Sequence, residues 1–274
     1  MTTMNELFDR YVKECVPKLA PRTQRDYQAI IRRLRATFGE MDCLAVKPRD
    51  VGRFLDVDTG KVSANRHISV LSAVFSKAVG RWYTHDDLRN PCIGVERNET
   101  KPRTRYITNE EFAALYAIVS PSVKIAMELA LMCGQRQGDL LRATWRQIDV
   151  TKRLMYFEQG KTGKKMAIRI TPKFEELLVR ARRIPPMLPR LYLIRRRDGQ
   201  PYTSEGFKAL WQRWMGRALK RGVLKQRFTF HDLRAKCVSD NKSIEAAMQL
   251  AGHTNMAMTR RVYDRGIREV DPLE

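Results

Sequence analysis

Apolar residues in the first 97 positions recur at intervals of three and four, the spacing that places side chains on one face of a helix. Two long stretches show this pattern, residues 22–38 and residues 63–80. A shorter stretch begins at Pro48. Another, with Leu7, Tyr11 and Cys15 on one face, follows a capping-box sequence that pairs Thr3 with Glu6. We therefore predict that the first 97 residues form a wholly helical domain.

The helical periodicity is lost after that domain. Residues 98–107 are polar and basic, include Pro102 and show no regular apolar spacing, which is typical of a linker. A second capping-box sequence, which pairs Thr108 with Glu111, follows at once. The second domain is therefore expected to cover residues 108–274.

The second domain mixes helical and strand-like patterns. A helical run covers 122–147, and two short β-like segments follow at 153–158 and 165–170. The segment Gly160–Lys164 between them is typical of a hairpin turn. Further helices are expected at about 172–182, 204–221, 230–239, 243–251 and 256–265. The predicted fold class is therefore mainly α, in two domains, with a small β-sheet or hairpin in the second.

Charge narrows the possible partners. The 274-residue chain has 52 Lys and Arg against 30 Asp and Glu, a net charge of +22, and its pI is about 10.2. Basic residues number 17 against 12 acidic ones over 1–97, and 35 against 18 over 98–274. Such an excess favours a polyanionic partner such as nucleic acid, and most of it lies in the second domain.

Other features exclude several classes of protein. The five cysteines are odd in number and never spaced as CxxC, which argues against a disulfide framework and against structural zinc. Glu6, Asp9 and Glu14 interrupt the N-terminal stretch, so no signal peptide is expected, and no apolar run reaches the length of a membrane span. We therefore expect a cytoplasmic protein with reduced thiols and no bound metal.

The last fifth of the chain contains an unusual group of polar residues. His231 and Arg234 are three residues apart and so share one face of a helix. His253 directly follows a glycine, and Tyr263 lies in a basic helical segment. Taken singly, each of these residues is more often structural than catalytic.

The upstream chain adds three more candidates. Arg136 lies in the segment CGQRQGDLL, where Asp139, three residues further on, is expected to hold its guanidinium in place. Lys161 lies at the tip of the predicted hairpin. An Arg/Asp pair and a hairpin lysine are each common on protein surfaces, so they gain meaning only as part of the set.

The set matches the needs of phosphodiester cleavage. That reaction requires an in-line nucleophile, cations at the equatorial oxygens and an acid at the leaving oxygen. Arginines grip phosphate bidentately, a lysine can protonate a leaving alkoxide, and a histidine can accept a phenolic proton. A tyrosine, with a reference pKa of about 10, needs a positive environment to attack. The combination indicates DNA strand cleavage by a tyrosine.

The order of these residues resembles the tyrosine recombinase family, and in particular phage-type integrases. The matching phrases are GQRQGDLL, QGKTGKK, FTFHDLRA, LAGH and TRRVYDR. Residues 1–97 resemble the family's core-binding domain, and residues 108–274 resemble its catalytic domain. The resemblance implies a clamp around double-stranded DNA, a homotetramer on synapsed sites that forms from free monomers, and no cofactor, since religation needs neither ATP nor metal.

The resemblance also implies a role for each candidate. Tyr263 would attack the scissile phosphate to form a 3′-phosphotyrosyl link and release a 5′-hydroxyl. Arg136 and Arg234 would stabilise the transition state, with Asp139 in support. Lys161 would protonate the leaving oxygen, and His231 would act as the base. His253 would hydrogen-bond the phosphate. In the helical domain, the arginines available to DNA phosphates are Arg22, Arg25, Arg32, Arg33 and Arg66.

Several functions fit these observations. Integration or excision of a phage or similar mobile element is the expected role, and Xer-like resolution of chromosome or plasmid dimers is the nearest alternative. A type IB topoisomerase-like enzyme would share the chemistry without strand exchange, and a DNA-binding regulator that has lost catalysis is a further alternative. A P-loop nucleotidase is excluded because Met155 stands where that motif needs its first glycine.

Overall fold

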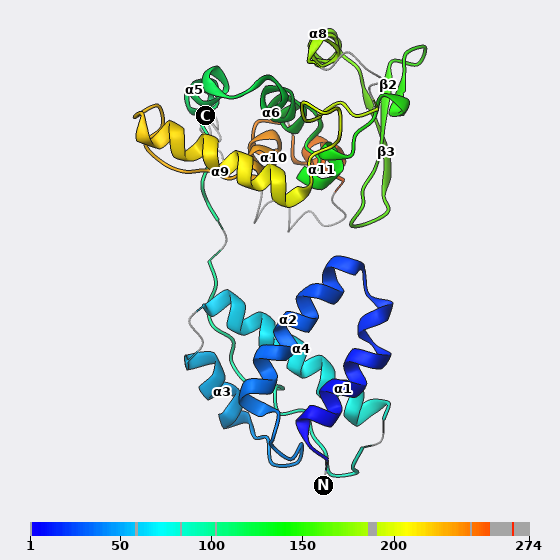
Figure 1. Cartoon of the computed structure of the whole chain (residues 1–274), viewed down its shortest axis with the longest axis vertical. Helices are drawn as coiled ribbons and strands as arrows, with labels where there is room; N and C mark the ends of the chain where they lie inside the picture. The colour runs from blue at the N-terminus through cyan, green and yellow to red at the C-terminus, as the bar shows by residue number, and fades with distance from the viewer. Residues whose placement is uncertain are drawn as a thin grey trace, which may run out of the picture. The chain divides into compact units, whose positions relative to one another are not determined.

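The computed structural model describes residues 2–57, 60–82, 84–101, 103–185, 191–241, 243–252 and 265. The chain divides into two compact units, Met1–Lys101 and Pro102–Glu274 (Figure 1), and the division lies inside the stretch expected as a linker. Each unit has a hydrophobic core of its own. Both units are mainly helical and the second contains one small antiparallel sheet, which confirms the predicted fold class. None of the helices in the described residues is long and apolar enough to cross a membrane.

In its described residues, the first unit contains four α-helices. Thr3 begins the first of them as predicted: its hydroxyl accepts the N–H of Glu6, and its own N–H donates to the Glu6 carboxylate. Pro21 opens the second helix, where a missing N–H costs nothing. The apolar faces that the sequence predicted are buried against one another. The helices are α1 (Met4–Glu14), α2 (Pro21–Phe38), α3 (Pro48–Val57) and α4 (Lys61–Gly80), with a 3₁₀ turn at Val16–Lys18.

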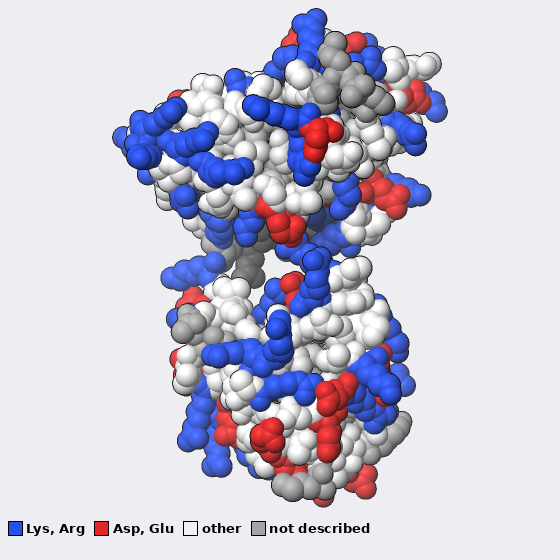
Figure 2. Space-filling model, viewed as in Figure 1, with Lys and Arg blue, Asp and Glu red and all other residues white. Residues whose placement is uncertain are grey.

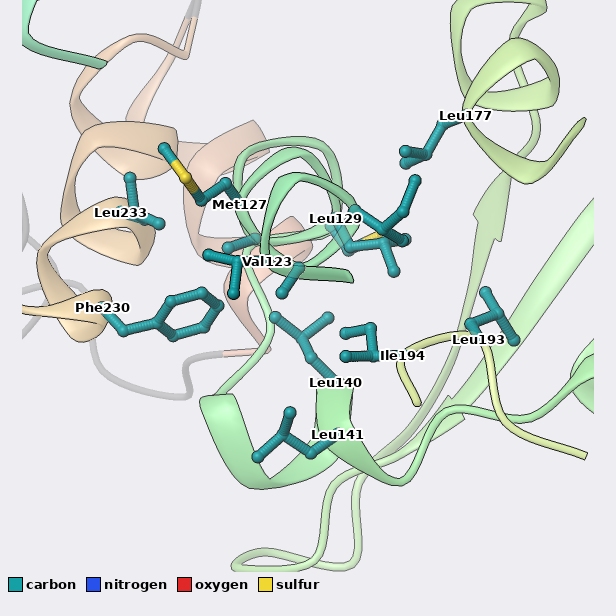
Figure 3. Packing of buried hydrophobic residues seen from close by; sticks show 14 of the residues in the cluster. Val123, Met127, Leu129, Leu140, Leu141, Leu177, Leu193, Ile194, Phe230 and Leu233 are labelled. Atoms are coloured by element: carbon teal, nitrogen blue, oxygen red, sulfur yellow. The ribbon is translucent and has the colours of Figure 1, made fainter. Parts of the chain in front are cut away.

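The second unit packs around α6 (Pro121–Cys133), which contacts α7, α8 and α10. Figure 3 shows side chains of α6, α7 and α10 pointing toward one another, with Val123, Leu140 and Phe230 among them. Helix α10 packs against both α6 and α11, so residues far apart in sequence come together there. The helices are α5 (Asn109–Ile118), α6 (Pro121–Cys133), α7 (Gln137–Leu141), α8 (Pro172–Arg183), α9 (Ser204–Lys220), α10 (Phe230–Ser239) and α11 (Ile244–Ala251), with a 3₁₀ turn at Trp145–Gln147.

The sheet lies at one side of these helices (Figure 1). Its strands are β1 (Ile148–Asp149), β2 (Leu154–Glu158) and β3 (Lys165–Arg169), antiparallel in that order, with Tyr156 opposite Ala167. The predicted hairpin is therefore confirmed, and the short strand β1 is an addition that the sequence pattern did not reveal.

The helical run expected over 122–147 is wrong as a single element. Gly134 adopts a left-handed conformation with φ 58° and ends α6, and Arg136 is extended before α7 begins. A glycine adopts this conformation without the steric cost that a Cβ imposes, so the chain changes direction here. The break places Arg136 at the N-cap of a new helix. The helix expected at 256–265 lies outside the described residues, except for Arg265.

A matched pair of valines in α4 tests whether the first unit depends on its own core. Val74 is 0% exposed and Val62 is 69% exposed. Val74→Ala is expected to lower the free energy of unfolding of this unit by about 2 kcal/mol, because two buried carbons are lost and a cavity remains. Val62→Ala should change it by less than about 0.5 kcal/mol. Chemical denaturation measures both, and equal effects would contradict the packing described for α4.

Candidate active site

Arg136 lies where the chain turns from α6 into α7. It is the N-cap of α7, and its extended backbone directs the side chain away from that helix. Its Nη1 donates a hydrogen bond of 2.8 Å to Oε1 of Gln159, beyond the end of β2. Gln159 therefore orients the guanidinium, and the Arg136 residue is only partly buried.

Arg234 approaches the same corner of the unit from α10. It is 1% exposed, and its guanidinium donates to the carbonyl oxygens of Gly134 and Ala251, the latter at 2.7 Å from Nη2. These carbonyls belong to the C-terminal ends of α6 and α11, where backbone acceptors lack helical partners. Arg234 thus joins two helix ends, one of which lies two residues before Arg136.

Gln159 connects the two arginines, and sequence reasoning missed it. Its side chain is fully buried, its Oε1 accepts from Arg136, and its Nε2 donates at 3.0 Å to the Ala251 carbonyl that Arg234 also contacts. The same Nε2 donates to Oε1 of Gln135 at 2.8 Å. A continuous chain of hydrogen bonds therefore joins the two guanidinium groups.

Gly252 is required beside this amide. Its φ is 69°, and a Cβ at this position would lie 2.4 Å from Nε2 of Gln159. Any other residue would displace the glutamine and would also adopt an unfavourable backbone conformation. Gly252 is the C-cap of α11. The next residue, His253, lies outside the described residues.

The hairpin that carries Lys161 is attached to the same glutamine. The N–H groups of Thr162 and Gly163 donate to the Gln159 carbonyl at 3.2 and 2.8 Å, and the Thr162 hydroxyl donates to its Oε1 at 3.0 Å. Lys161 itself is exposed in the turn. Its backbone is thus positioned relative to Arg136 while its amine remains in solvent, where it can move toward a bound phosphate.

Asp139 does not contact Arg136, contrary to the sequence prediction. Its Oδ1 accepts from Nη2 of Arg142 and from the N–H of Gly160, both at 2.9 Å. The reason is that Arg136 precedes the helix with an extended backbone, so the three-residue spacing does not place it on the face of Asp139. Asp139 instead holds the start of the hairpin.

His231 lies at the surface in the first turn of α10. Desolvation and the positive charges of Arg234, Arg265 and Arg136 lower its pKa, and Asp232 only partly offsets them. The imidazole is therefore predominantly neutral at pH 7 and able to accept a proton. The three guanidinium groups also define a strongly positive environment around it, as the proposed chemistry requires.

The remaining predicted residues are Tyr263 and the arginines of the first unit. Tyr263 lies outside the described residues. The five predicted arginines of the first unit are all exposed, and Arg66 forms an ion pair with Asp26 at 2.7 Å. The other four lie within one side of α2, given 3.6 residues per turn. They are Arg22, Arg25, Arg32 and Arg33.

The network therefore defines a site for an anionic group, with two positioned guanidinium groups, a neutral histidine and a hairpin lysine beside it. Comparison with known proteins gives the class. The sequence model of the phage integrase family matches residues 105–266. The chain belongs to this family and is a tyrosine recombinase, an enzyme that cleaves and rejoins DNA strands by transesterification.

Individual relatives agree with this assignment. The integrase of Escherichia phage HK022 is 25% identical over 99% of this chain and 78% of its own length, and that of Escherichia phage lambda is 26% identical over 99% and 79%. A lambda integrase dimer bound to a COC′ core site has a TM-score of 0.82 and 25% identity, covering 100% of this chain and 99% of that one. The Tn1549 transposon integrase shares the fold, with a TM-score of 0.79 and 16% identity. The match covers 94% of this chain and 93% of that one.

Replacement of Gln159 by methionine tests the hydrogen-bonded chain. Gln159→Met keeps the length of the side chain but leaves Arg136 and several buried groups without partners. We expect the rate of covalent DNA capture to fall by about 10- to 100-fold, because the arginine loses its orientation. Gln137→Met is the control, since the Gln137 amide donates to the Ser204 carbonyl at 3.3 Å, outside the network. Equal capture rates for the two variants would argue against the assigned role.

Proposed function

We propose that this protein is a site-specific recombinase of double-stranded DNA in which Tyr263 is the nucleophile. The observation that supports this most directly is the hydrogen-bonded chain that joins Arg136 and Arg234. Two positioned guanidinium groups suit the equatorial oxygens of a phosphate under attack, where negative charge accumulates. Family membership supplies the reaction class, and the site supports the assignment of individual residues.

The reaction is a transesterification. The Tyr263 oxygen attacks phosphorus, the bond from phosphorus to the 5′-oxygen breaks, and a 3′-phosphotyrosyl ester and a 5′-hydroxyl result. The phenolic proton passes to His231, and Lys161 protonates the departing 5′-oxygen. Attack by a 5′-hydroxyl on the ester reverses these steps and rejoins the strand. The number of phosphoester bonds is unchanged, so no energy source is consumed.

The other assigned residues have supporting roles. His253 donates a hydrogen bond to a non-bridging phosphate oxygen. Asp139 acts through the hairpin: its bonds to Gly160 and Arg142 set where the turn bearing Lys161 begins. This replaces the direct support of Arg136 that the sequence suggested.

DNA binding uses both units. Basic side chains are spread over the visible surface of each unit and outnumber acidic ones (Figure 2). Residues 1–97 act as the core-binding domain, with the exposed arginines of α2 and Arg66 at the phosphate backbone, and residues 108–274 act as the catalytic domain. Contacts to phosphates supply affinity and register rather than sequence preference.

The assembly and biological role are proposed by analogy with the relatives. A lambda integrase tetramer bound to a Holliday junction has a TM-score of 0.82 and 27% identity to this chain. We infer a homotetramer on two synapsed DNA sites, formed from monomers, in the cytoplasm of a bacterial host. The role that fits is integration or excision of a phage or similar mobile element.

Tyr263→Phe tests the nucleophile. On a nicked suicide substrate in buffer with EDTA, the wild-type protein should form a covalent complex and the variant should form none, while duplex binding stays within about threefold. Tyr156→Phe, at an exposed tyrosine of β2, is the matched control and should capture DNA normally. Capture by Tyr263→Phe would refute the nucleophile, and a strict metal requirement would refute the mechanism.

The pH dependence of capture tests His231. Because its pKa is lowered from 6.5 in the free protein, the neutral, proton-accepting form persists to a lower pH than for an ordinary histidine. At subsaturating DNA, where the rate reports groups of the free enzyme, we expect activity to be retained at pH 6.5 and to fall only below it. His231→Gln should lower the rate and remove this acid limb. An unchanged acid limb in that variant would exclude His231 as the base.

A further inference from the structure

We propose that a buried ion pair between Asp232 and Arg265, here called the latch, holds Arg265 on α10 of the same chain and is needed for efficient attack by Tyr263, two residues earlier in the sequence. This inference rests on the proposed function. It assigns positioning roles to two residues outside the set that the sequence singled out for catalysis.

The contacts of Arg265 are those of an anchor. Its Nη1 lies 2.7 Å from Oδ1 of Asp232, and the two side chains are 5% and 1% exposed. The same nitrogen donates to the Arg105 carbonyl at 3.0 Å, and the backbone N–H of Arg265 donates to the Ser239 hydroxyl at 2.7 Å. Backbone and side chain are therefore both bound.

These contacts extend along two turns of α10. Asp232 lies in the first turn and Ser239 is the last residue of the helix, seven positions later and on the same face. An arginine bound at both places lies lengthwise against the helix, which restricts its rotation as well as its position. A single surface ion pair would impose much less order.

The surroundings of Asp232 keep its carboxylate ionised and so able to pair with the Arg265 guanidinium. Its Oδ2 accepts the N–H and the hydroxyl of Thr229 at 2.7 and 2.8 Å and lies 3.3 Å from Nη2 of Arg103. Burial acts to raise the pKa of Asp232, but these bonds and the two arginines hold it below its usual value. The carboxylate therefore stays charged, and a buried charge without its partner is costly. That cost favours the docked state of Arg265.

The latch bears on Tyr263 through covalent reach. Consecutive Cα atoms are about 3.8 Å apart, so a residue two positions before an anchored one stays within about 8 Å of it. The anchor is close to the site, because His231 directly precedes Asp232 and the charge of Arg265 contributes to its lowered pKa. Holding Arg265 on α10 therefore limits how far the chain two residues earlier can move from that helix. Small errors in such positioning cost large factors in rate.

Three variants of the full-length protein test the latch by single-turnover capture on a suicide substrate and by DNA titration. Arg265→Ala is expected to slow capture at saturating DNA by about 100-fold while the half-saturating DNA concentration changes less than about threefold. Arg265→Lys, which keeps the charge, should recover part of the rate. Arg103→Ala is the matched control, because Arg103 faces the same carboxylate but is 56% exposed, and it should capture DNA at close to the wild-type rate.

A double-mutant cycle separates the latch from a general loss of structure. Asp232→Asn alone should slow capture, but in the Arg265→Ala background it should add less than about threefold, since the shared interaction is already lost. Additive effects, or wild-type capture by Arg265→Ala, would overturn the latch. Tyr263→Phe distinguishes this failure from failure of the proposed function: if it cannot capture DNA while Arg265→Ala captures normally, only the latch is wrong.

Discussion

The carbonyl oxygen of Ala251 accepts hydrogen bonds from Gln159 and from Arg234, and the arrangement of the site depends on this shared acceptor. Buried polar groups are costly when unpaired, so the ends of α6, α11 and β2 must meet in one geometry for all of them to be satisfied. Arg136 then takes its orientation from Gln159. The same hydrogen bonds therefore fix both the packing of these helix and strand ends and the positions of the two arginines.

The residues proposed for the reaction differ in how firmly the structure holds them, in keeping with their proposed roles. The proposed role of the arginines, stabilising charge at a phosphate, requires a preorganised position, and hydrogen bonds hold both side chains. Lys161, the proposed proton donor, is exposed on a hairpin that hydrogen bonds from Thr162 and Gly163 attach to Gln159. The positive charges near His231 repel one another, and a phosphate bound there would relieve that repulsion.

The sequence contained an indication of Gln159, although our sequence analysis did not identify that residue. Met155 and Phe157 are buried on the inner face of β2, and Gln159 continues that alternation by two residues. A glutamine at an inward-facing position has to find buried partners, which is a usable indication of a polar network. The break at Gly134 was harder to predict, because a single glycine in an apolar helical run is compatible with a continuous helix.

Local chemistry determined which segments are helical and where several begin, since spacing and capping depend on residues within a few positions of one another: the pairs at Thr3 and Thr108 form as predicted. The residue types also determined the class of reaction. Partner choice was decided only by the tertiary structure. Asp139 binds Arg142 and Gly160 rather than Arg136, because which groups a side chain meets depends on contacts between distant parts of the chain, and these are not encoded in sequence spacing.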